Sequence, residues 1–210
     1  MPHNSSGVFD ARASDNLDAA KVDCRKQAVL RRSKLATSSP DAAIMLAGHA
    51  AELTGRCGCG VYAGYVPIHS ELSPLALLEN LVGLGCELAL PITPEAGQPL
   101  MFHQWRIGGL LDDGPYGTKQ PPAGNNKCTP DVILAPMLAF DAGGWRLGYG
   151  GGFYDRTVAG LRGFGQRVPL IGIAYEGQRL DKIPVGPFDM PLDAVLSPSG
   201  MFWFGGSRKL

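Results

Sequence analysis

The spacing of apolar residues predicts two helices in the first part of the chain. Residues 15–36 follow Ser and Asp capping candidates and carry an apolar stripe at helical spacing, so they predict an amphipathic helix. The stripe consists of Leu17, Ala20, Cys24, Ala28 and Leu35. Residues 38–55 have a Ser cap, a Pro near the first turn and a final Gly55, and they predict a second helix.

Short apolar runs without polar alternation recur along the remaining chain. They are residues 57–67, 86–91, 131–136, 168–175 and 193–197. Such runs are typical of strands covered by helices on both faces, and residues 73–85, with an early Pro and a final Gly, predict a helix between the first two. Strands that alternate with helices predict an α/β fold, here a single-domain three-layer α/β/α sandwich with a mostly parallel central sheet.

A long irregular stretch interrupts this pattern at residues 107–130, which contain Gly and Pro throughout. A loop of this length within a compact domain is usually functional or mobile. The strand pattern continues after it, so the 210 residues predict one domain. Residues 1–14 are mostly small and polar, and we expect them to form a flexible arm in front of a domain of residues 15–210.

The charge and cysteine content limit the kinds of binding partner and the cellular compartment that we expect. The 19 Lys and Arg residues balance the 19 Asp and Glu residues, so no net positive field favours nucleic acid or an anionic membrane. The sequence shows neither a signal peptide nor an apolar run of transmembrane length, and five cysteines, an odd number, fit reduced thiols. We expect a cytoplasmic protein with no nucleic-acid, membrane or obligatory protein partner. Cys57 and Cys59 are interpreted as buried strand thiols rather than zinc ligands, because no second Cys or His pair accompanies them.

The most informative segment is residues 146–156, RLGYGGGFYDR, which leads into a predicted helix. Glycines at the start of a helix let backbone N–H groups converge on a phosphate, and Arg146 and Arg156 flank the turn as candidate phosphate clamps. Asp155 is a candidate Mg²⁺ ligand. The alternative is a tight crossover whose glycines serve packing alone. Neither a Walker A loop nor the dinucleotide fingerprint matches this spacing.

The same segment, with the strand before it, resembles the signature of 5-formyltetrahydrofolate cyclo-ligases, also called 5,10-methenyltetrahydrofolate synthetases. The matching residues are Pro136, Phe140, Asp141, Gly144, Arg146, Leu147, Gly148, Gly150, Gly152, Phe153, Tyr154 and Asp155. Four further family elements match Lys21 to Arg25, Tyr65 to Glu71, Tyr116 to Pro121 and Asp189 to Asp193, so the resemblance covers residues 21–198 in order. A match of this length is specific.

The resemblance implies an enzyme that closes a ring at the expense of ATP. ATP would phosphorylate the formyl oxygen of 5-formyltetrahydrofolate, N10 would attack the activated carbon, and phosphate would leave to give 5,10-methenyltetrahydrofolate. The expected cofactors are ATP and Mg²⁺, and the expected partner is the small-molecule folate. Alternatives are a homologue that binds folate or nucleotide without turnover, and a sugar-phosphate isomerase or acyl-transferase that needs no ATP.

The resemblance also implies roles for individual residues. The catalytic residues would be Arg146 and Tyr154. The ATP-binding residues would be Lys21, Arg25, Arg146, Leu147, Gly148, Tyr149, Gly150, Gly151, Gly152, Phe153 and Tyr154. The folate-binding residues would be Val66, Glu71, Tyr116, Tyr149, Gly150, Gly151, Gly152 and Phe153. Asp155 and Asp189 would bind Mg²⁺.

Several positions depart from the family pattern. Tyr149 and Gly151 stand in a loop that frequently carries a basic residue in the family, and Phe153 replaces a Tyr. Phosphate charge would then fall to Arg146 and to Lys21 and Arg25, which otherwise could form a solvated helix face. This predicts that the first helix packs beside the Gly-rich turn.

Overall fold

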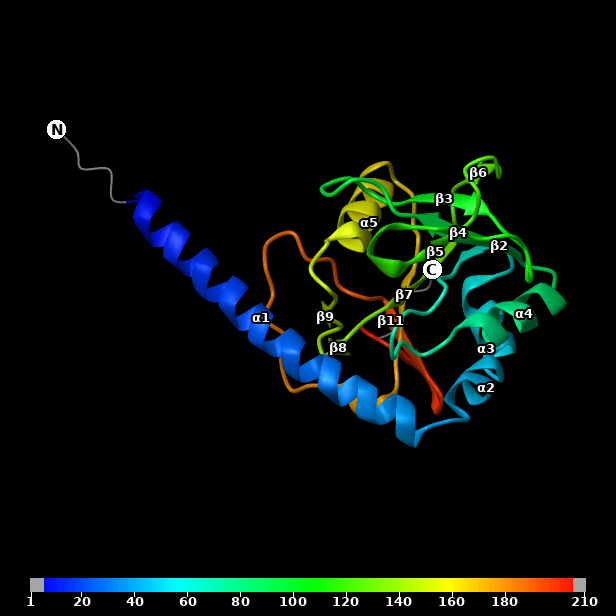
Figure 1. Ribbon diagram of the computed structural model, residues 1–210, viewed down its shortest axis with the longest axis horizontal. Helices are drawn as coiled ribbons and strands as arrows, with labels where there is room; N and C mark the ends of the chain where they lie inside the picture. The colour runs from blue at the N-terminus through cyan, green and yellow to red at the C-terminus, as the bar shows by residue number, and fades with distance from the viewer. Residues whose placement is uncertain (1–5, 206–210) are drawn as a thin grey trace.

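Helices cover both faces of a central sheet (Figure 1). The structure is a computed structural model that describes the backbone of residues 6–205 and the side chains of residues 15–205. The helices are α1 (Ser6–Ser38), α2 (Ala42–Ala47), α3 (Ala50–Cys57), α4 (Leu75–Gly83) and α5 (Phe153–Gly163), with 3-10 turns η1 (Pro115–Gly117) and η2 (Glu176–Gln178). The strands are β1 (Val61–Ala63), β2 (Glu87–Ile92), β3 (Met101–Gln104), β4 (Asp112–Asp113), β5 (Lys119–Gln120), β6 (Lys127–Cys128), β7 (Val132–Pro136), β8 (Ala139–Phe140), β9 (Arg146–Leu147), β10 (Leu170–Ile173), β11 (Ala194–Ser197) and β12 (Gly200–Trp203).

The main sheet has eight strands in the order β12-β11-β10-β7-β1-β2-β3-β6. Its five inner strands, β11 to β2 in that order, are parallel, and the register pairs Tyr62 of β1 with Leu88 of β2 and Val132 of β7. Antiparallel strands occupy both edges. The predicted mostly parallel sheet is confirmed.

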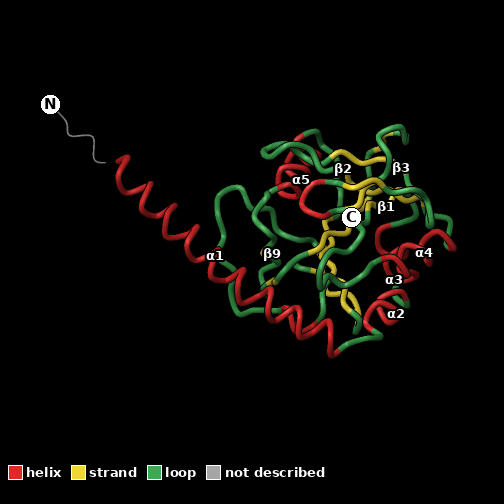
Figure 2. Tube along the Cα trace, viewed as in Figure 1, coloured by secondary structure: helices red, strands yellow, loops and turns green. Residues whose placement is uncertain are grey.

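Alternate residues of the inner strands point to opposite faces, and each face is covered by helices. On one face, Tyr62 and Leu134 pack with apolar residues of α2, α3 and α4, whereas Ala63 and Ile133 pack on the other face with Val158 of α5. Figure 2 shows the same layers, with the strands between α5 on one side and α2 to α4 on the other. The three-layer α/β/α sandwich is therefore also confirmed.

Helix α1 is longer than predicted, because it begins at Ser6 rather than at residue 15. Residues 6–14 of the expected arm are thus helical, and residues 1–5 lie outside the described residues; the flexibility of the arm stays a prediction. The N-terminal part of α1 extends beyond the body of the molecule (Figure 1). None of the helices in the described range 6–205 combines the length and apolar character needed to cross a membrane.

The stripe of α1 that faces the domain also differs from the predicted one. Ala20 is exposed, whereas Arg32 is 1 % exposed and Ala28 is 3 % exposed. Lys21 and Arg25 lie on the same side and are partly buried. The predicted stripe is therefore confirmed at Leu17, Cys24, Ala28 and Leu35 and wrong at Ala20, and basic side chains that the apolar pattern did not indicate share the same face.

The predicted helix over residues 38–55 is divided in two. The chain breaks the helix at Gly48 and His49, between α2 and α3. The predicted stop at Gly55 is wrong, since Gly55 is inside α3 and the helix ends before Gly58, whose φ of 78° is the left-handed conformation that favours glycine. The antiparallel strands β3, β6 and β12 at the two sides of the sheet were not predicted, because strands of two to four residues next to turns give a weak pattern.

Candidate active site

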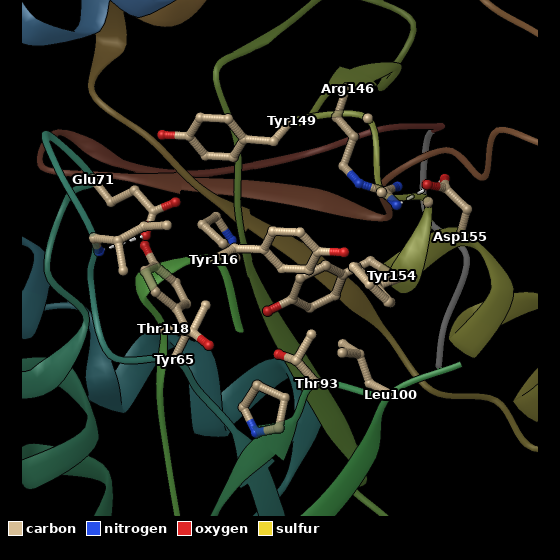
Figure 3. A pocket seen from close by; sticks show the side chains of 18 of the residues that line it. Tyr65, Glu71, Thr93, Leu100, Tyr116, Thr118, Arg146, Tyr149, Tyr154 and Asp155 are labelled. Carbon is tan, nitrogen blue, oxygen red and sulfur yellow. Dashed lines mark hydrogen bonds and ion pairs between the residues drawn. The ribbon is translucent and has the colours of Figure 1, made fainter. Parts of the chain in front are cut away.

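A cavity of about 610 Å³ opens at the carboxyl ends of β1, β2 and β7, where ligands bind in parallel α/β sheets (Figure 3). Its lining includes every residue to which the family resemblance assigned a role at the site. They are Lys21, Arg25, Val66, Glu71, Tyr116, Arg146, Leu147, Gly148, Tyr149, Gly150, Gly151, Gly152, Phe153, Tyr154, Asp155 and Asp189. The fold therefore brings together segments separated by well over a hundred residues.

The Gly-rich turn between β9 and α5 forms one wall of the cavity. Gly150 has φ of 103° and Gly152 has φ of 65°, conformations that disfavour other residues. A Cβ on Gly150 would lie 3.2 Å from the Arg25 guanidinium carbon, and one on Gly152 would lie 2.6 Å from Arg156 Nη1. Glycine is thus required both for the backbone path and for the approach of two arginines.

Arg146 is fixed at the start of this turn by two strong contacts. Its guanidinium donates to Asp155 Oδ1 at 2.8 Å and to the carbonyl oxygen of Met190 at 2.5 Å. The side chain is 6 % exposed. Burial lowers the pKa of Arg146 from its ordinary value, and the adjacent Asp155 carboxylate opposes that shift. The site therefore holds a desolvated, oriented cation that faces the cavity.

Arg156, the other predicted clamp, is directed elsewhere. It donates to the carbonyl oxygens of Gly151 at 2.5 Å and Gln98 at 3.2 Å, and it lies over the Phe153 ring. It does not line the cavity. The prediction that Arg156 clamps phosphate is therefore replaced by a role in holding the Gly-rich turn.

Helix α1 supplies further basic side chains next to the Gly-rich turn. Arg25 Nε donates to the carbonyl oxygen of Gly148 at 3.0 Å, which confirms the predicted contact between this helix and the Gly-rich turn. Lys21 Nζ lies 2.5 Å from Asp189 Oδ2, with both side chains partly buried. Lys21 is thus neutralised by a partner within the protein, while no acidic side chain pairs with Arg25 in the part of the chain described here.

Two carboxylates that line the cavity each have one oxygen available to bind a cation. Asp155 uses Oδ1 for Arg146 and for the backbone N–H of Met190, and Asp189 uses Oδ2 for Lys21 and for the N–H of Gly186. The other oxygen of each has no hydrogen-bond partner within the described residues. No cluster of three or more acidic, His or Cys ligands occurs among residues 15–205. The donor set fits Mg²⁺ when phosphate oxygens and water complete the coordination, as Mg²⁺ usually requires.

The structure adds one residue that the sequence did not indicate, Arg32. Its guanidinium donates to Tyr149 Oη at 2.5 Å, to the Met137 carbonyl oxygen at 3.0 Å and to Ser70 Oγ at 3.1 Å. It also lies 3.7 Å from the Glu71 carboxylate. Arg32 follows Lys21 and Arg25 at helical spacing. Continuing this basic stripe along the predicted helix would have indicated Arg32 from the sequence.

Glu71 and the side chains around it form the far wall of the cavity. The Glu71 side chain is 4 % exposed and accepts a hydrogen bond from the N–H of Ile68. Burial raises its pKa, while the Ile68 N–H and Arg32 oppose the rise. Burial likewise raises the pKa of Tyr154, so its phenol stays protonated. This wall presents a buried carboxyl group with a raised pKa and a phenol donor.

Aromatic and apolar side chains complete the cavity. The rings of Tyr116 and Phe153 lie 6.2 Å apart between centroids, and Tyr116 is 67 % exposed with φ of 61°. Tyr116 is carried by η1 in the long irregular stretch, which thus has a place at the site. The sequence missed the lining residues Asp18, Tyr65, Ile68, His69, Pro91, Thr93, Leu100, Thr118, Lys119 and Pro136. Six of them, Tyr65, Ile68, His69, Thr118, Lys119 and Pro136, lie within the matched family segments, which was the signal that could have found them.

Comparison with known proteins identifies the class. The model of the 5-formyltetrahydrofolate cyclo-ligase family matches residues 18–198. The chain is 35 % identical over 155 residues to a 5-formyltetrahydrofolate cyclo-ligase of Mycolicibacterium smegmatis, covering 70 % of this chain and 76 % of the relative. It is 32 % identical over 142 residues to the Escherichia coli K12 enzyme of the same name, covering 65 % and 77 %.

A solved structure agrees with the fold. The 5,10-methenyltetrahydrofolate synthetase of Mycoplasma pneumoniae superposes with a TM-score of 0.67 at 24 % identity, over 85 % of this chain and 98 % of that one. The chain belongs to the 5-formyltetrahydrofolate cyclo-ligase family.

Proposed function

We propose that this chain converts 5-formyltetrahydrofolate and ATP to 5,10-methenyltetrahydrofolate, ADP and phosphate. The observation that carries the proposal is the single cavity in which the Gly-rich turn, the basic side of α1 and the Glu71 wall converge. Such convergence would be unnecessary if the glycines served packing alone. Membership of the cyclo-ligase family supports the reaction.

The chemistry explains why such a cavity is needed. The formyl oxygen is a poor leaving group, and transfer of the γ-phosphoryl group to it creates a C–O–P linkage; N10 then attacks the carbon and loses its proton, and the C–O bond breaks to release phosphate. Both steps require alignment and neutralisation of phosphate charge more than an acid or base. A Ser-His-Asp triad is neither needed nor formed by the lining residues.

In the proposed complex, ATP lies along the Gly-rich turn. The backbone N–H groups of residues 148–152 and the start of α5 face phosphate oxygens, as helix N-termini commonly do. Arg25 and Arg146 supply positive charge on either side of Gly148 in this turn, and Arg146 with the Tyr154 hydroxyl binds the phosphoryl group during transfer. Lys21 remains paired with Asp189 and contributes at the edge of this positive field.

Mg²⁺ belongs to the same proposal. Asp155 and Asp189 would hold it through the oxygens that have no partner within the described residues. A bound Mg²⁺ would screen the charge of the phosphate groups. The protein contribution is to orient the two carboxylates, which Arg146 and Lys21 do through the opposite oxygens.

The folate is proposed to occupy the other half of the cavity. Tyr116 and Phe153 provide flat walls for the pterin, with Val66 and the turn from Tyr149 to Gly152 beside it, and Glu71 provides an acceptor or a donor for its polar edge. Arg32 touches neither substrate in this arrangement; it positions Glu71 and Tyr149. We place this reaction in the cytoplasm, in accord with five cysteines that are all free.

The test is the appearance of methenyl-folate absorbance with purified protein. We expect product formation with 5-formyltetrahydrofolate, ATP and Mg²⁺ together, one ADP per product, and none when nucleotide is omitted or Mg²⁺ is chelated. Equal conversion without ATP would contradict the proposed reaction. Binding of folate and ATP without turnover would instead identify a non-catalytic homologue.

The contact between α1 and the Gly-rich turn gives a prediction for ATP binding. Arg25→Ala is expected to raise the KM for ATP about 10- to 100-fold, since a charge-assisted hydrogen bond contributes about 1.5–3 kcal/mol. The KM for folate should change little. Lys26→Ala is the matched control, because Lys26 is the next residue of the same helix, is exposed and pairs only with Asp23. Identical ATP kinetics in both variants would show that Arg25 serves only to attach the helix.

A further inference from the structure

A pair of cysteines lies at the end of the sheet opposite the cavity. Cys59 precedes β1 and Cys86 precedes β2, and their sulfur atoms are 2.6 Å apart although the residues are 27 positions apart in the chain. Cys59 is exposed and Cys86 is 5 % exposed. The two side chains therefore point directly at each other, and one of the two residues is exposed.

The backbone on both sides of the pair is held in place. The N–H of Glu87 donates to the carbonyl oxygen of Gly60 at 3.0 Å, which extends the β1–β2 ladder up to the two cysteines. The N–H of Cys86 donates to the Leu81 carbonyl oxygen at 3.0 Å at the end of α4. A covalent bond between the sulfurs would thus join two segments that are already fixed at the right separation, which is the main geometric requirement of a disulfide.

We propose that Cys59 and Cys86 are a peroxide-sensitive thiol pair that forms a reversible disulfide. The Cys59 thiolate attacks hydrogen peroxide, forming a sulfenic acid and releasing water after protonation. The Cys86 sulfur then attacks the Cys59 sulfur, forming the S–S bond and releasing a second water molecule. The two thiols together lose two electrons and two protons, and the peroxide gains them. A small dithiol reverses the reaction.

The surroundings of the other thiols favour this pair and this order of attack. Burial raises the pKa of Cys57 and Cys86 to about 11, and it also raises the pKa of Cys24 and Cys128. A raised pKa leaves less thiolate at neutral pH, so these four sulfurs react slowly with peroxide. Cys59 is the exposed cysteine among residues 15–205, and Cys86 is the sulfur within its reach.

The disulfide would act on the fold and leave the cavity open. It closes a covalent ring over residues 59–86, which contains β1, α4 and the Glu71 wall. Such a ring restricts the unfolded chain and stabilises the folded one. The cavity lies at the carboxyl ends of the same strands, so the bond is at the far end from the substrates.

The experiment treats the reduced full chain with a few equivalents of hydrogen peroxide, quenches it, and counts thiols. We expect free thiols to fall from five to three, a Cys59–Cys86 link in the peptide map, full return of thiols with dithiothreitol, and a Tm higher by roughly 5–10 °C in the oxidised form. Cys59→Ser should keep its four remaining thiols, whereas in Cys86→Ala the Cys59 thiol should be oxidised to a sulfenic acid without forming a link; both variants should lose the Tm increase. Cys57→Ser is the matched control and should still form the link.

Three results would overturn the proposal. They are five intact thiols after treatment of the wild-type chain, a link between any other pair formed at the same rate, and conversion of Cys59 to a sulfinic acid with Cys86 still free. The peptide map of the wild-type chain decides between them without a variant, so a folding defect of Cys86→Ala would not affect the outcome. None of these measurements depends on the proposed ligase reaction.

Discussion

Replacing Arg146 with methionine is expected to lower kcat/KM for both ATP and folate by about 10²- to 10³-fold, the usual cost of one preorganised electrostatic contact to a transition state. Methionine keeps much of the length and apolar stem but removes the charge. The buried guanidinium of Arg146 is fixed by Asp155 and by the Met190 carbonyl oxygen, so no other side chain can take its place. Steady-state kinetics with each substrate varied in turn measure the effect.

The control for this variant is Arg162→Met. Arg162 also pairs with an aspartate, Asp193, at 2.5 Å, but it lies at the other end of α5 and does not line the cavity. Its loss should lower Tm and leave kcat/KM of the folded protein nearly unchanged. Arg146→Lys separates charge from geometry, since lysine retains the charge without the planar fork. If Arg146→Met lowered Tm yet retained wild-type kcat/KM, Arg146 would be structural.

The second large effect is expected at Arg32. Arg32→Met should lower the free energy of unfolding by about 3–5 kcal/mol, because it leaves a buried carboxylate without its counter-charge. Arg32 is 1 % exposed, and its nearest acid is Glu71, whose side chain is 4 % exposed. Urea unfolding at neutral pH measures the loss. Activity should also fall, since Glu71 and Tyr149 both depend on Arg32 for their positions.

Removing the Glu71 charge as well tests whether an unpaired carboxylate causes the stability loss of Arg32→Met. Arg32→Met combined with Glu71→Gln should recover part of the lost stability, because the double variant buries no unpaired charge. It should not recover activity, since Glu71 lines the proposed folate half of the cavity. A double variant no more stable than Arg32→Met would show that the loss comes from packing of the Arg32 stem.

The stability of Arg32→Met is expected to fall as the pH rises. Burial raises the pKa of Glu71 above its ordinary value of 4.5, so the folded state retains the proton to a higher pH than the unfolded chain does. This group therefore lowers stability as the pH rises from about 4.5 through the folded pKa. Without Arg32, which opposes the shift, the pKa of Glu71 rises further. The stability of Arg32→Met should thus fall more steeply with pH, and over a wider range, than that of the wild type.

The fold was predictable where the chain pattern is unambiguous. The inner strands, such as Val132–Pro136, are continuous apolar runs, because helices cover them on both faces and no polar residue is tolerated. The break at Gly48 was not predictable, since Gly within a helical pattern can be accommodated or can end it, and tertiary packing decides. A short edge strand such as β12 owes its structure to the neighbouring strand rather than to its own pattern.

The site was predictable where its residues carry a motif. The run from Arg146 to Asp155 identified one wall, and the resemblance to a family added Lys21, Arg25 and Glu71. Arg32 was missed because a buried arginine looks in sequence like any exposed one; only its partners in three dimensions mark it. Arg156 was assigned wrongly, because spacing places an arginine beside a turn without indicating which side of the turn its guanidinium faces.

The basic face of α1 also has a consequence for synthesis on the ribosome. This helix emerges early, but the Gly148 carbonyl oxygen that Arg25 contacts follows 123 positions later, and Asp189 follows Lys21 by 168. A nascent helix with an apolar face would expose aggregation-prone surface until those later residues had been synthesised. Lys21, Arg25 and Arg32 stay hydrated until their partners have been made. The domain-facing side of α1 thus mixes these charged residues with apolar ones such as Ala28 and Leu35, and the charged part reduces the apolar surface exposed during that delay.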